Sequence, residues 1–477
     1  MRGIPSLITD IRKKVFTEVA RMAYSGKGYE GVDELPYIIV PGDRPLHRES
    51  VFLERAIVSE RVRMAMGLNI RPLQTRHLMT EGMDAAAVAE QYYEPPLINI
   101  IPYACHACTT NTYRVTQYCQ NCLASSCAKV CPKDAIYTHN GRKHIDLDKC
   151  IKCGKCAKAC PYHAIIHLER PCAAACGMDA IESDEYGRAV INQDKCVACG
   201  QCLVSCPFGA IADKGQIYQV IQSILQGSKV VAIVAPAFIG QFGKSSSPGK
   251  FIAAMKKLGF HRIMEVAIGA DICTVEEAKD FLEKVPAQQN YMATSCCPAW
   301  HSMIYRLFPG EAKNISMTLT PMVFTARLMK KKYPGCKVVF VGPCAAKKLE
   351  AIREDIRSDV DFVLTFEELQ GMFEAKEINF ETIEPMYDLN EGTAAGRGFA
   401  VAGGVAKAVE DLVHENGYIA EKAAAMPQML SARNGKTGEE FDRWMTKFRQ
   451  FKWDSEFSRE MSRSCSQMVR HWCGEKE

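Results

Sequence analysis

The second half of the chain alternates short apolar runs with amphipathic stretches. Residues 229–238, 337–344 and 360–369 are β-branched apolar runs bounded by turn or capping residues, as buried strands are. Between them, residues 247–260 and 274–285 place apolar side chains at helical spacing. Strands that alternate with helices predict a parallel α/β domain. In such a domain ligands bind at the carboxyl ends of the strands.

Helical signals also occur outside this alternation. Thr365 and Glu368 have the spacing of a capping box directly after a strand-like run, which predicts that a helix begins there. Residues 1–100 show helical patterning, for example over residues 54–68, and contain no motif that indicates a chemistry. We therefore expect a helical accessory region at the N-terminus.

Composition changes this picture through one residue type, cysteine. Of the 23 cysteines, sixteen lie between Cys105 and Cys206. The net charge of +4 is small for 477 residues, so nucleic acid is not expected as a partner. No secretory h-region and no run of about 18 uncharged apolar residues occurs, which predicts a cytoplasmic protein without a membrane span. In a reducing compartment, clustered cysteines favour metal ligation over disulfides.

The clustered cysteines form four related units. Residues 150–161, CIKCGKCAKACP, match the run in which three cysteines hold one 4Fe-4S cluster and the fourth reaches its neighbour. The endings CPKDAI, CPYHAI, CGMDAI and CPFGAI begin at Cys131, Cys160, Cys176 and Cys206, and such repetition marks similar structural units. Zinc ribbons also use paired C-x2-C elements. The triplet spacing favours iron–sulfur clusters over zinc.

One of the four units is interrupted. Cys172 and Cys176 keep the spacing of a unit's last two cysteines, and Cys105 with Cys108 supplies its missing first half. Residues 101–215 would then hold two ferredoxin-like units, one nested inside the other. Because the fourth cysteine serves the partner cluster, every thiol is assigned. The inner sets are Cys119, Cys122, Cys127 with Cys160, and Cys150, Cys153, Cys156 with Cys131; the outer sets are Cys105, Cys108, Cys172, Cys206, and Cys196, Cys199, Cys202, Cys176. Four 4Fe-4S clusters would form a relay for single electrons.

Two later motifs indicate where such a relay ends. They are ATSCCPAW at residues 293–300 and GPCAAKKLE at residues 342–350, and Cys344 follows a predicted strand. These motifs resemble the first and second active-site signatures of the FeFe hydrogenases, enzymes that interconvert protons, electrons and dihydrogen. The resemblance covers roughly residues 100–410. It implies an α+β ferredoxin-like cluster region followed by an α/β FeFe-hydrogenase-like catalytic domain over residues 216–425.

The resemblance also implies an active centre, the H-cluster. In the family this is a 4Fe-4S cubane joined through one cysteine to a di-iron unit that carries CO, cyanide and a bridging amine dithiolate. By position, Cys297 and Cys344 resemble cubane ligands, and Cys296 resembles the thiol that passes protons to the bridging amine. Lys347 resembles the residue that hydrogen-bonds a cyanide ligand, and Glu350 would orient that part of the site.

The family further has a proton path of two carboxylates and a serine. The matching residues here are Glu277, Asp280 and Ser316. Glu277 and Asp280 are three residues apart and would share one face of a helix, although a solvated acidic face is an alternative interpretation. Cys273 and Cys336 have no partner at ligand spacing, so we expect them to be packing or surface thiols.

The third cysteine signature of the family, which supplies the remaining cubane ligands, is not found. Residues 396–411 fit the segment that precedes it, but residues 426–477 have the composition of an unrelated charged tail. Cys465 and Cys473 are eight residues apart without a glycine run and do not match the missing pair.

Two function hypotheses follow. The first is an FeFe hydrogenase that exchanges electrons with ferredoxin or a similar carrier, acts on protons and dihydrogen, and is loaded by hydrogenase maturation factors. The alternative is a non-catalytic iron–sulfur electron-transfer, assembly or sensor protein on the same scaffold. The cysteine pair and Lys347 favour the first hypothesis, and the absent third signature favours the second.

Overall fold

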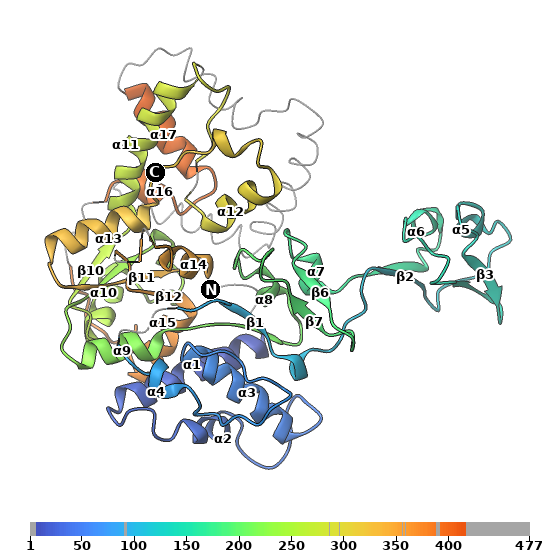
Figure 1. Cartoon of the computed structure of the whole chain (residues 1–477), viewed down its shortest axis with the longest axis horizontal. Helices are drawn as coiled ribbons and strands as arrows, with labels where there is room; N and C mark the ends of the chain where they lie inside the picture. Colours follow the sequence, from blue (N-terminus) through green and yellow to red (C-terminus); the bar gives the residue numbers. More distant parts are fainter. Residues whose placement is uncertain are drawn as a thin grey trace.

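The structure, a computed structural model, has three visible parts (Figure 1): a bundle of N-terminal helices, an α/β part, and a cysteine-rich part that ends in a projecting arm. It describes residues 6–89, 93–285, 287–294, 296–354, 356–357, 359–387 and 392–415. The predicted tail at 426–477, with Cys465 and Cys473, lies outside these residues. None of the helices within the described ranges has the length and apolarity needed to cross a membrane.

A four-stranded parallel sheet lies at the centre of the α/β part. Its strand order is β10-β9-β11-β12, with β9 at Val230–Val234, β10 at Arg262–Glu265, β11 at Lys337–Gly342 and β12 at Phe362–Thr365. The three runs predicted as strands are β9, β11 and β12, which are almost entirely buried. Strands covered on both faces need apolar side chains throughout, which explains the unbroken runs. Edge strand β10 has a mixed burial pattern and was not predicted.

Helices connect and cover these strands. They are α10 (Pro248–Lys257), α11 (Ala267–Lys284), α12 (Pro298–Leu307), α13 (Pro321–Lys332), α14 (Ala346–Ala351) and α15 (Phe366–Ala375). The predicted capping box is confirmed, because the Glu368 N–H donates to the Thr365 hydroxyl and the Thr365 N–H donates to the Glu368 carboxylate at 2.6 Å. Beyond it, α16 (Ala394–Gly398) and α17 (Gly404–Glu415) pack on α11.

The N-terminal helices share the core of the α/β part. They are α1 (Leu7–Tyr24), α2 (Leu35–Ile39), α3 (Val51–Ala65) and α4 (Met83–Ala86), so the predicted helical patterning of residues 54–68 is confirmed up to Ala65. Helix α1 packs on α15 and on α9 (Ile217–Leu225). Gly371 of α15 allows this close approach, because a Cβ there would lie 2.6 Å from the Cβ of Phe16. One hydrophobic core therefore joins the two parts.

The cysteine-rich part consists of two ferredoxin-like units. In the outer unit β1 (Ile98–Ile100) pairs with β8 (Ile211–Asp213) and β6 (Ile181–Ser183) with β7 (Ala189–Ile191). In the inner unit β2 (Thr112–Val115) pairs with β5 (Ile165–Leu168) and β3 (Ile136–His139) with β4 (Arg142–Ile145). Short helices α5 (Ser126–Lys129) and α6 (Lys155–Ala159) pack together in the inner unit, as α7 (Pro171–Ala174) and α8 (Gln201–Ser205) do in the outer unit.

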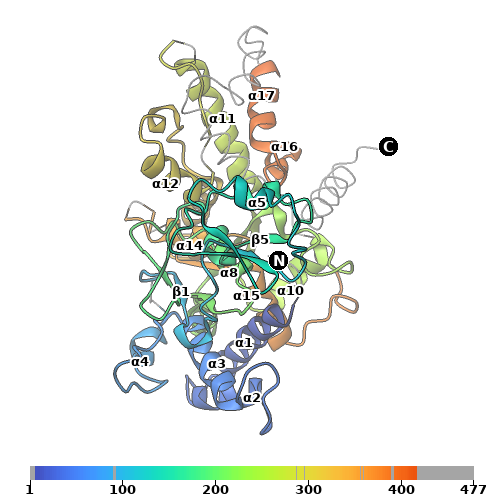
Figure 2. The ribbon, with the colours of Figure 1, turned by 90° about the vertical axis from the view of Figure 1, so that its right-hand side faces the viewer.

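The inner unit, residues 112–168, projects from the body of the molecule and is called the arm below. Figure 1 shows it extending to the right beyond the outer unit, and Figure 2 views the molecule from the side on which it projects. The outer unit lies between the arm and the α/β part. The order along the molecule is therefore arm, outer unit and sheet.

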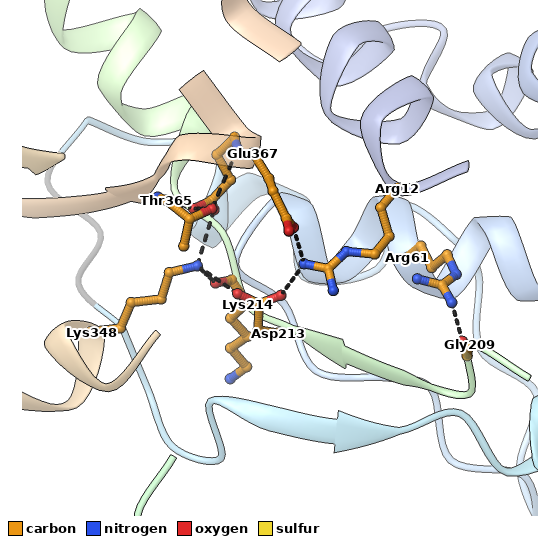
Figure 3. Close-up of polar contacts among 9 residues, drawn as sticks. Arg12, Arg61, Gly209, Asp213, Lys214, Lys348, Thr365 and Glu367 are labelled. Atoms are coloured by element: carbon orange, nitrogen blue, oxygen red, sulfur yellow. Dashed lines mark hydrogen bonds and ion pairs between the residues drawn. The ribbon is translucent and has the colours of Figure 1, made fainter. Parts of the chain in front are cut away.

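A buried ion network joins the three parts (Figure 3). Arg12 of α1 contacts Asp213 of β8 at 3.2 Å and Glu367 of α15 at 2.6 Å. Lys348 of α14 contacts the other oxygen of Asp213 and a carboxylate oxygen of Glu368, each at 3.1 Å. The Lys348, Asp213 and Glu368 side chains are at most 2% exposed. A buried charge without a partner is strongly unfavourable, so each member depends on the others.

Replacing Lys348 by methionine tests this network. The substitution removes the ammonium shared by two buried carboxylates and should lower the free energy of unfolding by about 3–5 kcal/mol. Anaerobic denaturant unfolding followed by circular dichroism would measure it. Lys407→Met is the matched control, because Lys407 and its partner Asp411 are largely exposed, and it should cost no more than about 1 kcal/mol. Equal losses in both variants would contradict the role of the network.

Candidate metal centres

The first C-x2-C pair of each of the four cysteine units contains a strained turn. The second residue between the two cysteines has a positive φ at Ala107 (48°), Asn121 (45°), Lys152 (59°) and Ala198 (50°). This left-handed conformation costs a non-glycine residue about 1–2 kcal/mol. The turn directs an amide at the preceding sulfur in two of the pairs: the Lys152 N–H donates to Cys150 Sγ and the Ala198 N–H to Cys196 Sγ, each at 3.4 Å. Strain that recurs at equivalent positions indicates a functional constraint.

The repeated six-residue endings have a second common geometry. Their fourth residue, at Asp134, His163, Asp179 and Gly209, also has a positive φ. The following alanine N–H then donates to the sulfur of Cys131, Cys160, Cys176 and Cys206 at 3.3–3.4 Å. Hydrogen bonds to sulfur stabilise thiolate charge and adjust the potential of a bound cluster. The repeated six-residue ending therefore corresponds to a repeated turn in which a backbone N–H donates to the cysteine sulfur.

Two predicted cysteine sets each line one hollow. Cys105, Cys108, Cys172 and Cys206 line a space of about 310 Å³, and Cys131, Cys150, Cys153 and Cys156 line a space of about 330 Å³. The second set includes a cysteine from the neighbouring unit, as the predicted exchange of the fourth ligand requires. Four thiols around a space with mostly apolar walls suit a 4Fe-4S cubane. Within the described ranges, no three His, Cys, Asp or Glu side chains converge as the ligands of a single metal ion would.

Members of the other two sets interact electrostatically with one another. Burial raises the pKa of the Cys127 thiol, and Cys160 and Cys122 add to this effect. Burial also raises the pKa of Cys199 to about 12, with contributions from Cys176 and Cys196. Thiols that resist ionisation in this way become thiolates when a metal centre binds them.

Two buried arginines lie beside the hollow of the outer unit. Arg170 donates to the carbonyl of Cys108 at 3.1 Å and to that of Gly187 at 2.6 Å. Arg61, from the N-terminal helix α3, donates to the carbonyl of Gly209 in the turn after Cys206 (Figure 3). Burial lowers the pKa of Arg61 to about 10, so it remains charged at neutral pH. Nearby positive charge favours the more negative, reduced state of a cluster.

The other outer set adjoins the two hydrogenase-like motifs. Cys176, Cys196 and Cys199 pack in one apolar cluster with Cys297 and Cys344. The Cys199 thiol is close enough to Cys344 for the two to interact electrostatically. Trp300 packs in the same cluster. The proposed end of the relay and the proposed catalytic cysteines are therefore neighbours in space.

Strand and helix ends position the two motifs. Cys344 lies two residues beyond β11, at the carboxyl edge of the sheet, and Cys297 is the N-cap residue of α12. Lys347 Nζ donates to the carbonyl of Cys296 at 3.0 Å and contacts Glu350 at 2.6 Å. Burial disfavours the charged ammonium and so lowers the pKa of Lys347. The Glu350 carboxylate stabilises the ammonium by more than burial destabilises it, so the pKa of Lys347 is raised overall. Thr320, which sequence reasoning missed, donates to the other oxygen of Glu350 at 2.6 Å.

The structure brings the three proton-path candidates together. Glu277 and Asp280 lie on α11, and the Ser316 hydroxyl donates to Asp280 at 3.4 Å and lies close enough to Glu277 to oppose the effect of burial on its pKa. Glu277 is 2% exposed, so the solvated-face interpretation does not hold for it. Its Oε2 has no hydrogen-bond partner among the described residues. Burial raises the pKa of Glu277 to about 7. Asp280 also pairs with Lys284 at 2.8 Å, a residue that sequence reasoning missed.

The two unassigned cysteines differ in their surroundings. Cys273 is buried on α11 one turn before Glu277, and its charged or ionisable neighbours include Glu277, Cys296 and Lys347. It therefore lies between the proton-path candidates and the cysteine pair. Its spacing of four from Glu277 was the signal that could have placed it there. Cys336 is a buried packing thiol that donates to the carbonyl of Met329 at 3.8 Å.

Comparisons with known proteins agree with this arrangement. Residues 228–446 match the family described as iron only hydrogenase large subunit, C-terminal domain. Residues 143–166 and 189–212 match the 4Fe-4S binding domain. The protein is FeFe-hydrogenase-like. It combines an α/β domain of this kind with a ferredoxin-like, 4Fe-4S-binding region, as the motifs predicted.

Relatives of this FeFe-hydrogenase-like protein fall into two groups. Iron hydrogenase 1 of Clostridium pasteurianum is 30% identical over 58% of this chain and 52% of its own length. NADP-reducing hydrogenase subunit HndD of Solidesulfovibrio fructosivorans is 28% identical over 57% of this chain and 51% of its own length. Cytosolic Fe-S cluster assembly factor NAR1 of Kluyveromyces lactis is 29% identical over 22% of this chain and 23% of its own length. The chain thus spans about half the length of the two hydrogenases.

The raised pKa of Glu277 gives a test of its protonation state. The side chain should be a neutral acid below pH 7 and a carboxylate above it. Infrared difference spectra taken between pH 6 and pH 8 should show the loss of a protonated carboxyl band with a midpoint near 7. The Glu277→Gln variant should lack that band, whereas Glu276→Gln, which changes the neighbouring, partly exposed carboxylate, should keep it. A band that persists in Glu277→Gln would mean that another group titrates.

Proposed function

We propose that this protein is an FeFe hydrogenase that exchanges electrons with a ferredoxin-type carrier in the cytoplasm. In this proposal the sixteen clustered cysteines would hold four 4Fe-4S clusters, which would supply the electron transfer, and Cys297 and Cys344 would hold an H-cluster. The main support is the shared apolar cluster in which Cys196 and Cys199 pack with Cys297 and Cys344. An electron relay can supply a catalytic centre only when the two are adjacent, so this packing of the cysteines supports the proposal.

The four relay clusters would be held by the cysteine sets predicted from spacing. Two of these sets each line a single hollow, and members of the other two interact electrostatically. Amides from the left-handed turns donate to six of the sulfurs, and the Ala189 N–H of β7 donates to a seventh, that of Cys105. Such bonds stabilise the reduced state of a cluster in a partly apolar surrounding.

At the catalytic end, the residues of this chain would bind, orient and carry protons. When bound, the H-cluster supplies the metal centre at which protons and electrons combine to give dihydrogen. Lys347 is held between the Cys296 carbonyl and Glu350, which orients its ammonium as a hydrogen-bond donor to an anionic ligand such as cyanide. Cys296 would exchange protons at its thiol, for which thiol chemistry near neutral pH is suited.

Protons would reach Cys296 through α11. Asp280 is partly exposed and lies at the outer end, and the buried Ser316 donates to it at 3.4 Å beside Glu277. Glu277, with a pKa of about 7, can both accept and release a proton under working conditions. Cys273 lies between Glu277 and Cys296 and provides a polarizable thiol on that route.

The proposal divides the chain by role. Residues 1–100 form the accessory region, residues 101–215 the electron relay, and residues 216–425 the catalytic domain. Maturation factors would have to supply the di-iron unit. The third cysteine signature of the hydrogenases is not found by sequence, so the proposal assigns two cubane ligands, Cys297 and Cys344.

Iron content tests the relay. Replacing Cys105 and Cys172 together by alanine removes two of the four thiols around one hollow and should lower the iron content by about four atoms per chain. Anaerobic protein would be measured by iron and acid-labile sulfide determination. Cys336→Ala is the control, because Cys336 is a buried thiol outside every set, and its iron content should equal that of the unchanged protein. A loss of iron from the Cys336→Ala control relative to the unchanged protein would contradict the assignment. Zinc in place of iron would contradict it as well.

Infrared spectroscopy tests the catalytic centre. Protein produced together with maturation factors should show bands of bound CO and cyanide and should evolve dihydrogen from a reduced viologen. Substituting Lys347 by methionine removes the donor to cyanide and should abolish both the bands and the activity, or nearly so, while iron in the relay remains. Matured protein that contains about sixteen irons but lacks these bands would exclude hydrogenase activity for this chain.

That last outcome would favour a second candidate function. The partial similarity to an Fe–S cluster assembly factor and the absent third signature are consistent with a non-catalytic iron–sulfur electron-transfer, assembly or sensor protein. In that case the relay clusters would be present, and Cys297 and Cys344 would serve a different centre or none.

A further inference from the structure

The arm is far more basic than the rest of the chain. Residues 112–168 contain nine lysines and arginines and three aspartates, a net charge of +6. The whole chain carries +4, so the remainder of the sequence carries −2. An elongated element that concentrates one sign of charge creates a field that attracts a partner of the opposite sign.

Most of this positive charge is available at the surface. Eight of the nine cationic side chains are exposed: Arg114, Lys129, Lys133, Arg142, Lys149, Lys152, Lys155 and Lys158. By contrast, the Asp146 carboxylate is used locally, because it accepts from the backbone N–H groups of Asp148 and Lys149. Asp146 also pairs with Lys149 at 3.6 Å, and Asp134 and Asp148 are exposed, so the arm presents eight exposed cations against two exposed carboxylates.

A predicted cluster ligand reaches the surface in the same place. Of the 21 cysteines that the structure describes, only Cys153 is exposed. It lies directly between Lys152 and Lys155 in sequence, with Gly154 as the cap of α6. Lys155 and Lys158 are three residues apart on α6 and so share one face of that helix.

An exposed apolar side chain adds to this face. Ile151, two residues before Cys153, is 56% exposed. A contact surface of modest area with one apolar anchor and a ring of charges is typical of transient electron-transfer complexes, which form quickly and dissociate quickly. The face made of Lys149, Ile151, Lys152, Cys153, Lys155 and Lys158 is called the tip face below.

We propose that the tip face docks an acidic one-electron carrier protein, one that surrounds its own redox group with carboxylates. This inference rests on the proposed function in one respect, that the arm holds clusters. In the complex one electron passes from the reduced carrier to the oxidised cluster behind Cys153, and no bond forms or breaks. The exposed cluster ligand at the centre of the lysines distinguishes this partner from a nucleic acid or an anionic membrane, neither of which would use it.

Binding to an acidic 2[4Fe-4S] ferredoxin in its oxidised form tests the inference. Titration calorimetry with the full-length, cluster-loaded protein should show binding that weakens steeply between low and high salt. Reversal of two charges in Lys152→Glu/Lys155→Glu should weaken binding at low salt on the order of tenfold or more. The control Lys27→Glu/Lys244→Glu changes two exposed lysines outside the arm and should stay within about twofold of the unchanged protein.

A rate measurement separates this inference from the proposed function. Reduced ferredoxin should bleach the arm's clusters more slowly in the Lys152→Glu/Lys155→Glu variant, whereas the small cation methyl viologen, once reduced, should bleach them no more slowly than in the unchanged protein. Protein without any bleachable cluster would refute both the proposed function and this inference, whereas cluster-loaded protein that binds ferredoxin but lacks the CO and cyanide bands after maturation would refute the proposed function alone. Equal ferredoxin affinity in all variants would overturn the inference. So would charge-sensitive binding of a DNA oligonucleotide or of phosphatidylserine vesicles in the absence of ferredoxin binding.

Discussion

The geometry of the cysteine-rich part depends on one backbone constraint, the left-handed turn beside each cysteine pair. Ala107, Asn121, Lys152 and Ala198 adopt positive φ although none is a glycine. Each such turn costs about 1–2 kcal/mol, so a chain without a further source of stability would relax it. Thiolate–metal bonds are a source of the required size, because metal binding contributes folding free energy directly. The strained turns and the ligand sets are therefore linked, because binding of the clusters would offset the free energy that the turns cost.

The buried ion network connects this cluster region to the catalytic end. Adjacent residues Lys347 and Lys348 on α14 point to opposite sides: Lys347 contacts the Cys296 carbonyl and Glu350, and Lys348 contacts Asp213 and Glu368. Asp213 is the last residue of β8, the final strand of the outer ferredoxin-like unit. Anchoring one face of α14 to this strand therefore fixes the position from which Lys347 reaches the cysteine pair. Removing the anchor would affect stability and site geometry together.

Sequence patterning predicted the strands, the capping box and the cysteine sets because each depends on local spacing. Fully buried strands such as β9 show as apolar runs, and ligands on tight turns show as short repeats. Edge strand β10 was missed because it carries mixed polar and apolar residues. Thr320 and Cys273 were missed for another reason: their partners, Glu350 and Cys296, are distant in sequence, and only the packing of α11 and α13 against the motifs brings them near. Contacts between residues that are distant in sequence leave no periodic pattern in that sequence.

The sequence indicated no chemical role for the accessory region. In the structure two of its arginines contact the cysteine-rich part. Arg61 donates to the turn that follows Cys206, and Arg12 holds Asp213 seven residues further along the same segment. One arginine therefore places positive charge beside a predicted cluster, and the other ties that segment to α15 through Glu367. A buried cation near a cluster favours its reduced form, so these helices can influence the relay without holding any ligand. Removing residues 1–100 would expose the shared core and also change the electrostatic surroundings of the outer clusters. In the proposed relay the N-terminal helices would therefore influence electron transfer through charge rather than through ligands.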